Sequence, residues 1–540
     1  MDKRAVLAIV LSLIVVFTWQ MFFAPKPVKR GEESAQKETT VADKKQTERE
    51  AAGPETAKQP VKSSTVASPA TPTIEKYIPV ETPLYSAIFS TRGGALKSFR
   101  LKGYRQKLDR NSEPIEMVHI SNGMPYPLSS TFPESNIDIR PDSSFSVDVN
   151  AVDLMKTKDS RRLTFSLTHP GSIKLEKTYT FHPDKFAFDL EIKVYNLTRS
   201  AINQSALLSW HQFVDPKQDT DSYVHEGPIS FMEKSIERYE IKKMEPTNLL
   251  GPDVAWGGFE NKYFIASIIP QNPTLTSILL SKDDRSLVSV GMKGTQSLIP
   301  QDQSMSFGYT LYVGPKDHDI LKTEKVGLEN AIDFGSWLKW LAMPLLVCLK
   351  FLYKYVHNYG IAIIILTILI KIIFWPLGNK SYKSMKEMQK LQPKIIELRE
   401  KYKDDKARIG QETMALYKSH KVNPLGGCLP MLIQIPVFFG LYKALMYAIE
   451  LRHSPFYWWI QDLSEKDPYY ITPLIMGATM FIQQKMSPPA GDPMQQKIML
   501  IMPVIFTFMF LNFPSGLVIY WLFQNILSIG QQYYINKLPY

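Results

Sequence analysis

Five apolar runs in the last third of the chain limit the folds that are open to it. They cover residues 360–377, 424–449, 471–486, 498–513 and 516–534. None of them contains an aspartate or a glutamate, and their lengths are close to those of helices that cross a bilayer. A sixth apolar run, Ala5–Ala24, follows two basic residues at the N-terminus. We therefore expect a polytopic α-helical membrane protein with six transmembrane helices.

The N-terminal run predicts a signal anchor that stays on the mature protein. Its removal by a signal peptidase, which is the alternative, needs small side chains near the cleavage site. Bulky aromatic residues instead fill the end of the run, WQMFFAPKP. From Pro25 to Thr73 the chain has no aromatic residue, so this segment cannot bury enough apolar surface to offset the entropy of ordering. We expect an anchor over residues 1–24 and a disordered tether over 25–73.

Residues 74–335 show a different pattern, in which apolar and polar side chains alternate. In the segment 186–195 every second side chain is apolar, and the segments 163–168 and 144–149 repeat this period. Strict alternation places one face of a strand on a core and the other in water, which is typical of antiparallel sheets. The sequence therefore predicts a large antiparallel β-sandwich.

The distribution of charge indicates how the chain crosses the membrane. The formal net charge of +11 alone would also fit a nucleic-acid-binding protein. However, twelve Lys or Arg and six Asp or Glu lie in the segment 378–421, between two apolar runs. Because basic loops stay in the cytoplasm, we expect this loop and both termini there, the β-sandwich on the other side of the membrane, and no direct contact with nucleic acid.

Two segments beside the apolar runs are predicted to be amphipathic helices. The first, residues 336–358, is interrupted by Lys339, Lys350 and Lys354, which favours a helix lying in the outer membrane interface. A span whose lysines snorkel is the alternative. The second is a cytoplasmic helical hairpin over 378–421. Its apolar seam consists of Met388, Leu391, Ile395, Leu398 and Tyr402.

Lys371 is the one charged residue in the run 360–377. A charge at the centre of a spanning helix costs about 2.5–3.5 kcal/mol on insertion scales. Either its side chain snorkels to the cytoplasmic headgroups, or it faces a water-filled recess together with Thr367, one turn earlier on the same face. Because the apolar runs contain no acidic partner, Lys371 in a recess would attract an anionic group: an acidic peptide segment, a small anion or a lipid headgroup.

Other polar side chains in the runs strengthen the prediction of a recess. They are Gln434, Gln484, and the pairs Tyr520/Gln524 and Trp521/Asn525. Any one of them could bond to a neighbouring helix, but several together indicate a shared polar site. The aromatic faces of Tyr520 and Trp521 could form a surface that packs against many apolar partner sequences, or they could equally serve helix packing.

Neither cysteines nor histidines indicate a metal or a cofactor. Cys348 and Cys428 lack metal-ligand spacing, and no two histidines form an HxxxH pair. The topology places the two cysteines toward opposite sides of the bilayer, so we expect no disulfide. We also expect no cofactor and no catalytic residue.

Several long stretches resemble the YidC/Oxa/Alb family of membrane protein insertases. They are FSTRGGALKSF, LQPKIIELREKY, KVNPLGGCLPMLIQIPVFFGLY, DPYYITPLIMGATMFIQQKMSP and DPMQQKIMLIMPVIFTFMFLNFPSGLVIYW. The resemblance is collinear from the anchor to the C-terminus and most specific over residues 360–534. It implies a protein of the bacterial inner membrane that is not an enzyme. Such a protein inserts and folds other membrane proteins, alone or with the Sec translocon.

The resemblance also implies a domain plan and a site. The expected parts are the anchor (1–24), the tether (25–73), the periplasmic β-sandwich (74–335), the interfacial helix (336–358) and a five-helix insertase core (359–540) containing the hairpin. The core would hold a hydrophilic groove open to the cytoplasm and to lipid. The expected groove residues are Lys371, Thr367, Gln434, Gln484, Tyr520 and Trp521.

Two departures from the family pattern matter for function. Lys371 stands where relatives usually have arginine, so the charge remains but bidentate hydrogen bonding is lost. After Tyr534 only INKLPY remains, which lacks a long basic tail, so ribosome binding is expected to be weak or transient. The expected partners are nascent inner-membrane proteins, the Sec translocon with its accessory subunits, the ribosome and membrane lipids.

Two other functions remain open from the sequence. A transporter or channel for small anions would use Lys371 as a selectivity charge. A carbohydrate-binding or enzymatic module in the periplasm would use the β-sandwich, although a fold alone does not identify an activity.

Overall fold

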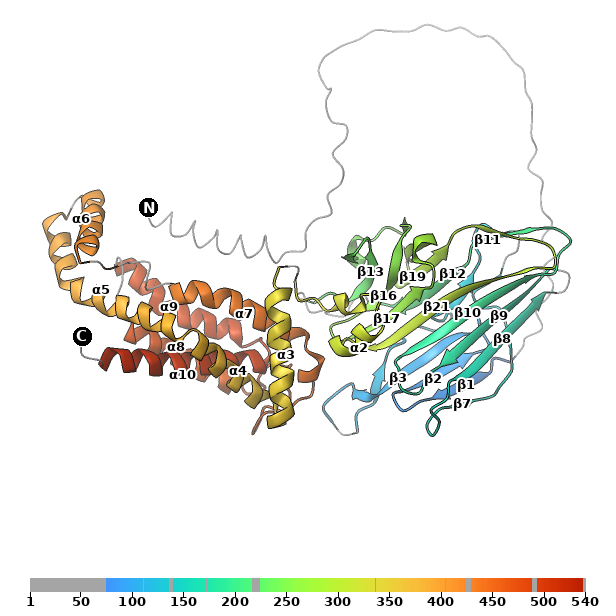
Figure 1. The fold of residues 1–540 in the computed structure, drawn as a ribbon, viewed down its shortest axis with the longest axis horizontal. Coiled ribbons are helices and arrows are strands. Elements are labelled where there is room, and N and C mark those ends of the chain that lie inside the picture. The colour runs from blue at the N-terminus through green and yellow to red at the C-terminus, as the bar shows by residue number, and fades with distance from the viewer. Residues whose placement is uncertain are drawn as a thin grey trace, which may run out of the picture. The chain divides into compact units, whose positions relative to one another are not determined.

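The computed structural model describes most of the chain after the predicted tether. The described residues are 74–109, 111–135, 139–169, 172–215, 224–335, 337–403, 405–420, 422, 429–487 and 493–537. The predicted anchor, the tether and Cys428 lie outside them. These described residues fall within one compact unit, in which strands are followed by helices (Figure 1).

The described strands form one nine-stranded sheet, two five-stranded sheets and one two-stranded sheet. The nine-stranded sheet has the order β14 (Ser235–Arg238), β13 (Gly227–Met232), β16 (Val254–Glu260), β17 (Phe264–Pro270), β21 (Ser304–Pro315), β10 (Ala187–Asn196), β9 (Ile173–Phe181), β8 (Arg161–His169) and β6 (Ser146–Val147). A five-stranded sheet contains β4 (Pro114–Glu116), β3 (Ala95–Arg105), β2 (Tyr85–Ser90), β1 (Tyr77–Glu81) and β7 (Val152–Asp153). A second five-stranded sheet contains β15 (Thr247–Leu250), β18 (Thr276–Lys282), β19 (Leu287–Gly294), β12 (Leu207–Phe213) and β5 (Ser129–Thr131). The strands β11 (Ile202–Gln204) and β20 (Ser297–Ile299) form a separate pair. Among the described strands every pairing is antiparallel except that of β1 with β7, so the predicted β-sandwich is confirmed.

Alternation along the strands builds the core of the sandwich. On β9 every second side chain, from Ile173 to Phe181, is buried, and the same period continues on β10. The buried side chains face those of β2 and β3, with ring centroids 4.7 Å apart for Phe89 and Tyr179 and 6.1 Å apart for Phe99 and Phe188. Aromatic contacts of this kind join the two layers that Figure 1 shows in blue and green.

The second five-stranded sheet packs closely on the other end of the nine-stranded sheet. Gly257 of β16 leaves no room for a side chain there, since a Cβ atom would lie 2.4 Å from Met292 Cε. The buried Trp210 and Trp256 lie in the same core. This close approach explains why a glycine occupies the middle of a strand.

A lysine lies inside the sandwich without access to solvent. Lys177 on β9 is 0% exposed, and its ammonium donates hydrogen bonds to the backbone carbonyls of Gly93 at 3.0 Å and Leu128 at 2.6 Å. Burial penalises the charged form and lowers the pKa of Lys177 to about 7.

Raising the pH above neutrality is expected to stabilise the sandwich through Lys177. The unfolded chain keeps this pKa near 10.5, so between these two values the unfolded state binds more protons and stability rises with pH, by on the order of 4 kcal/mol in total. In Lys177→Met no group titrates at this position, and the rise in stability that Lys177 causes should disappear. The urea midpoint of the sandwich at pH ~7 and ~9.5 measures the effect. An equal rise in both proteins would contradict it.

Helices follow the strands, and several of them are rich in apolar residues. They are α2 (His318–Thr323), α3 (Lys339–Val356), α4 (Tyr359–Ile373), α5 (Trp375–Lys401), α6 (Lys406–Ser419), α7 (Leu429–Tyr447), α8 (Ile471–Met486), α9 (Pro493–Phe510) and α10 (Ser515–Lys537). Short 3-10 helices are η1 (Ile241–Lys243), η2 (Pro273–Leu275), η3 (Leu328–Ala331) and η5 (Ile449–Leu451). Within the described ranges, no helix is by itself both long and apolar enough for a span, whereas α4 and α5 together are, with a bend of 64° between them.

This bend corrects the predicted end of the helix in the apolar run 360–377. We expected one continuous helix to Leu377 and a hairpin from Gly378, but α4 ends at Ile373 and α5 begins at Trp375. Pro376 explains the break, because proline has no N–H to donate to the carbonyl four residues earlier and restricts the residue before it. Lys371 consequently lies in the last turn of α4, where a cation complements the helix dipole.

The hairpin consists of α5 and α6, which lie side by side in Figure 1. Asp405 caps α6 by accepting a hydrogen bond from the N–H of Arg408 at 2.9 Å. Leu391 and Ile395 are the buried members of the predicted seam, whereas Ile396 is 50% exposed.

Two of the three lysines of α3 contact acidic or polar groups outside their own helix. The ammonium of Lys350 lies 2.6 Å from Asp319 Oδ2 and 2.9 Å from Glu450 Oε1, and that of Lys339 donates to Asn330 at 2.7 Å. A span whose lysines snorkel to the headgroups, which was the alternative, does not predict these contacts with protein groups. They tie α3 to the segment after β21 and to the loop after α7. Whether α3 lies in the outer interface stays a prediction.

The loop between α7 and α8 packs against the start of α10. Ser515 donates from its N–H and from its hydroxyl to the carbonyl of Glu465, both at 2.7 Å, and the N–H of Gly516 donates to Leu463. Asp467, which is fully buried, accepts from the N–H of Thr472 in the first turn of α8. These bonds fix the starts of α8 and α10 relative to each other.

Candidate functional site

The ammonium of Lys371 is held by a serine from another helix. Its Nζ lies 2.7 Å from Oγ of Ser528 on α10 and donates a hydrogen bond to it. Among the ion pairs that join described residues, none involves Lys371. The half-buried ammonium therefore has a neutral hydrogen-bond partner in place of a carboxylate among the described residues.

Two further side chains complete a cluster around Ser528. The phenol of Tyr382, near the start of α5, lies beside the side chains of Ser528 and of Gln483 on α8. Lys371, Tyr382, Gln483 and Ser528 thus join four helices at one place. We refer to these four residues as the lysine cluster.

One face of α10 carries a row of buried polar side chains through this region. Asn525, Ser528, Gln531 and Gln532 are at most 6% exposed. Gln531 donates to the carbonyl of Trp375 and to Asn379, and Gln532 donates to the carbonyl of Met486. The amide oxygens of Gln524, Gln531 and Gln532 are buried without a hydrogen-bond partner among the residues that the structure describes. Unpaired acceptors of this kind are usually satisfied by water, so the row favours a hydrated interior.

A second polar contact joins Gln434 of α7 to α10. Its amide nitrogen donates to the hydroxyl of Tyr520 at 2.5 Å, and its oxygen accepts from Gln524 at 3.5 Å. Gln434 is half-buried, but Tyr520 is 0% exposed. The structure therefore places Tyr520 in the joint between α7 and α10 rather than on a surface.

Trp521 packs in an aromatic cluster between α7, α9 and α10. Its ring centroid lies 4.7 Å from that of Phe438, 5.3 Å from that of Phe510 and 6.3 Å from that of Phe506. The side chain is half-buried. This arrangement favours the packing role that the sequence left open.

Trp521→Ala is therefore expected to lower the amount of folded protein. Truncating a large aromatic side chain inside a packed cluster costs about 3–5 kcal/mol. Abundance in the membrane should fall, while the activity per molecule stays near that of the unchanged protein. Trp458→Ala is the matched control, since Trp458 is 81% exposed. Intact abundance with lower activity per molecule would instead make Trp521 a contact for the substrate.

The remaining predicted groove residues lie in different surroundings. Thr367 is 0% exposed, and its hydroxyl donates to the carbonyl of Ile363 in its own helix, so it does not reach a recess in this structure. Gln484 is half-buried on α8, next to Gln483. The prediction missed Ser528 and Tyr382. The spacing of Tyr520, Gln524, Ser528 and Gln531 along one helical face is the signal that could have found Ser528.

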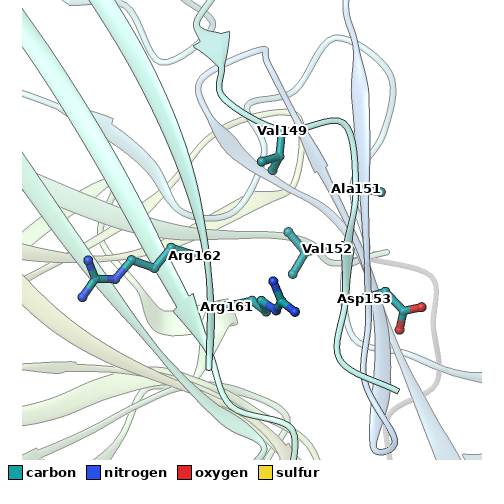
Figure 2. Close-up of a pocket in the computed structure, with 6 residues that line it drawn as sticks. All are labelled: Val149, Ala151, Val152, Asp153, Arg161 and Arg162. Carbon is teal, nitrogen blue, oxygen red and sulfur yellow. The ribbon is translucent and has the colours of Figure 1, made fainter. Parts of the chain in front are cut away.

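The sandwich carries a shallow cleft of about 290 Å³ between β7 and β8. Figure 2 shows Arg161 between the two strands, with Arg162 and Asp153 directed to opposite sides. Asp153 is the one carboxylate among the described residues that line it. Glycoside hydrolysis generally uses two carboxyl groups, so this cleft gives no support to the hypothesis of a carbohydrate-processing module.

Comparison with known proteins identifies the family. Residues 351–539 match the model of the 60Kd inner membrane protein, and residues 77–348 match that of the YidC periplasmic domain. The membrane protein insertase YidC of Syntrophus aciditrophicus is 63% identical over 550 residues, covering 99% of this chain and 100% of the relative. The chain belongs to the YidC family of membrane protein insertases.

Other members of the YidC family align over almost the whole chain. The membrane protein insertase YidC of Geobacter metallireducens is 42% identical over 538 residues, covering 99% of this chain and 98% of the relative. The crystal structure of an active YidC insertase with its first transmembrane domain resolved is 18% identical and covers 99% of this chain, with a TM-score of 0.38.

Membership of the YidC family confirms the predicted family and the fold class. It identifies the β-sandwich as the periplasmic domain of a bacterial inner-membrane insertase. The names of the relatives state insertion of membrane proteins and no catalytic activity. They give no support to an anion channel.

Proposed function

We propose that the chain inserts and folds nascent inner-membrane proteins through a hydrophilic groove centred on Lys371. The observation that carries this proposal is the lysine cluster. A cation in an apolar helix donates to a neutral serine, beside a row of buried amides with unpaired oxygens. A charge without a fixed counter-ion in hydrated surroundings attracts an anionic group that passes by.

The client's short hydrophilic tail is the anionic group that we propose. An ammonium has three donors, and Ser528 is the one acceptor for them within the described ranges, which leaves two for carboxylates or water. A tail with acidic residues would be drawn to Lys371, while the glutamine side chains and their water would replace part of its hydration. Gln434 and Gln484, which are half-buried, would extend this lining, and Tyr520, Trp521 and Thr367 would hold the helices that form it.

The apolar segment of the client would leave along α7 and α9 into lipid. Ile501, Val504, Ile505 and Phe508 are each more than half exposed and form one stripe of α9. Transfer of the client's apolar side chains from water to lipid supplies the driving force, so no nucleotide is needed. The 16 residues of α8 span about 24 Å, less than the ~30 Å of a bilayer core, which would thin the membrane locally.

The proposal includes a topology and a set of partners. Six membrane spans would place the hairpin of α5 and α6 and both termini in the cytoplasm, with the sandwich outside. The chain would work alone or with the Sec translocon and its accessory subunits. The basic hairpin would meet the ribosome weakly or transiently.

Timed crosslinking during synthesis of a small membrane protein tests the route. A photoreactive residue at Ile396 on the exposed side of α5 should capture the nascent chain before one at position 371 does, because the hairpin is charged and packs on little apolar surface. Val347 on the exposed side of α3 is the control position and should stay uncrosslinked at the early time. Capture at 371 before 396 would reverse the proposed order, and capture at neither would refute the groove.

A further inference from the structure

The hydroxyl of Ser528 donates one hydrogen bond within its own helix and accepts one from another helix. It donates to the carbonyl of Gln524 in its own helix at 2.8 Å and accepts from Lys371 at 2.7 Å. The hydroxyl of Tyr382 lies beside it. A hydroxyl has one donor, which Ser528 uses within its own helix, so toward Lys371 it can act only as an acceptor.

Ser528 is itself firmly placed. Its side chain is 5% exposed, and its neighbours on α10 bond to other helices: Asn525 donates to Thr479, and Gln531 donates to Asn379. The oxygen that receives Lys371 is therefore part of a packed helix. By contrast, Ile372 and Ile373, which follow Lys371, are 59% and 72% exposed. Without Ser528 the long side chain of Lys371 could follow them toward lipid and the headgroups.

We propose that Ser528 is a positioning residue for Lys371 in the proposed insertion reaction. It holds the ammonium over the polar face of α10, where a client's acidic tail would arrive, and away from the lipid-facing side of α4. A serine suits this role because it accepts a hydrogen bond without cancelling the charge, which a carboxylate at the same place would do. Tyr382, at the root of the hairpin, lies beside the same hydroxyl.

The inference rests on the proposed function of Lys371, and its test separates the two. Full-length protein in liposomes would insert one client carrying zero or two acidic residues in its tail. The measured quantity is the ratio of two-acid to zero-acid insertion. Lys371→Gln should bring this ratio to about one. If Lys371→Gln keeps the original ratio, both the groove charge and the role of Ser528 are refuted.

Three variants then address Ser528 alone. Ser528→Ala should lower the ratio about threefold while zero-acid insertion stays near normal, because the charge remains but is no longer held. Ser528→Asp should bring the ratio to one or below, because the new carboxylate pairs with Lys371. Thr479→Val is the matched control: it removes a comparable contact between α8 and α10 that does not touch Lys371, and should leave the ratio unchanged.

Two results would overturn the role of Ser528 while leaving the groove charge intact. In the first, Ser528→Asp keeps the original ratio although Lys371→Gln abolishes it. In the second, Ser528→Ala loses the same fraction of insertion for both tails, as Thr479→Val would if the contact mattered only for packing. Membrane abundance of each variant, measured alongside, normalises insertion per molecule.

Discussion

Lys371→Glu is expected to lower the insertion of a client with two acidic tail residues by about tenfold or more, and that of a neutral client far less. Substitution turns attraction at the centre of the groove into repulsion. Two unit charges about 5 Å apart in surroundings of effective dielectric constant ~20 interact by ~3 kcal/mol, and ~1.4 kcal/mol already corresponds to a factor of ten. Purified variants in liposomes, with tails of zero, one or two acids, give the measurement.

Two other variants at the same position serve as controls for charge. Lys371→Arg should preserve insertion, since the charge stays and guanidinium can still donate to Ser528. Lys371→Gln should fall between the unchanged protein and Lys371→Glu, with a deficit that grows with the number of tail acids. If the glutamine and glutamate variants lose the same fraction of insertion for every tail, the charge of Lys371 does not attract the client. That result would favour the snorkelling alternative.

Glu260→Gln is expected to destabilise the periplasmic domain by about 3–5 kcal/mol, which is most of the stability of many domains. Glu260 is 2% exposed and holds two cations: its carboxylate lies 2.7 Å from Nε of Arg238 and 2.9 Å from Nζ of Lys316. Lys316 is also buried, so loss of the negative charge leaves uncompensated positive charge inside the protein. Asp333 can offset little of it, because that carboxylate already pairs with Lys443 at 2.9 Å.

The denaturation midpoint of the sandwich, followed in full-length protein, measures this effect. Glu134→Gln is the matched control: it removes an ion pair with Lys293 that also measures 2.9 Å, but the carboxylate is 57% exposed. An exposed pair contributes about 1 kcal/mol or less. If the two variants shift the midpoint equally, the buried network of Glu260 does not stabilise the domain.

The period of two along the strands was a sufficient guide to the sandwich. The core position of Phe188 follows from its place in an alternating segment, because a strand exposes and buries successive side chains in turn. The pairing of β1 with β7, which is parallel, was not predictable in this way, since it depends on contacts between segments far apart in the sequence.

In the helical part, apolarity alone does not predict where a helix breaks. The apolar pattern predicts one helix through Pro376 to Leu377, because apolarity does not report the loss of a backbone donor. The partners of Lys350 could not be predicted at all: Asp319 and Glu450 come from segments 31 residues before and 100 residues after it, and only the tertiary fold brings them together.

For the candidate site too, some residues follow from the sequence pattern and others depend on how the helices pack. Lys371 was identifiable because a lone charge in an apolar run is costly, whatever the fold. Which polar neighbours face it depends on how the helices pack, so Thr367 was expected beside it and Ser528 was not. Tyr520 is polar at its tip and apolar in its ring, and only the packing of α7 on α10 decided that it is buried.

Insertion into liposomes that contain this chain as their one protein tests the central claim most directly. A small client with a two-acid tail is added without nucleotide or Sec components, and the tail's protection from external protease is measured. The account predicts protection well above that in protein-free liposomes, with loss of most of the gain in Lys371→Glu. Equal protection with and without the protein would contradict the claim that the chain inserts membrane proteins by itself.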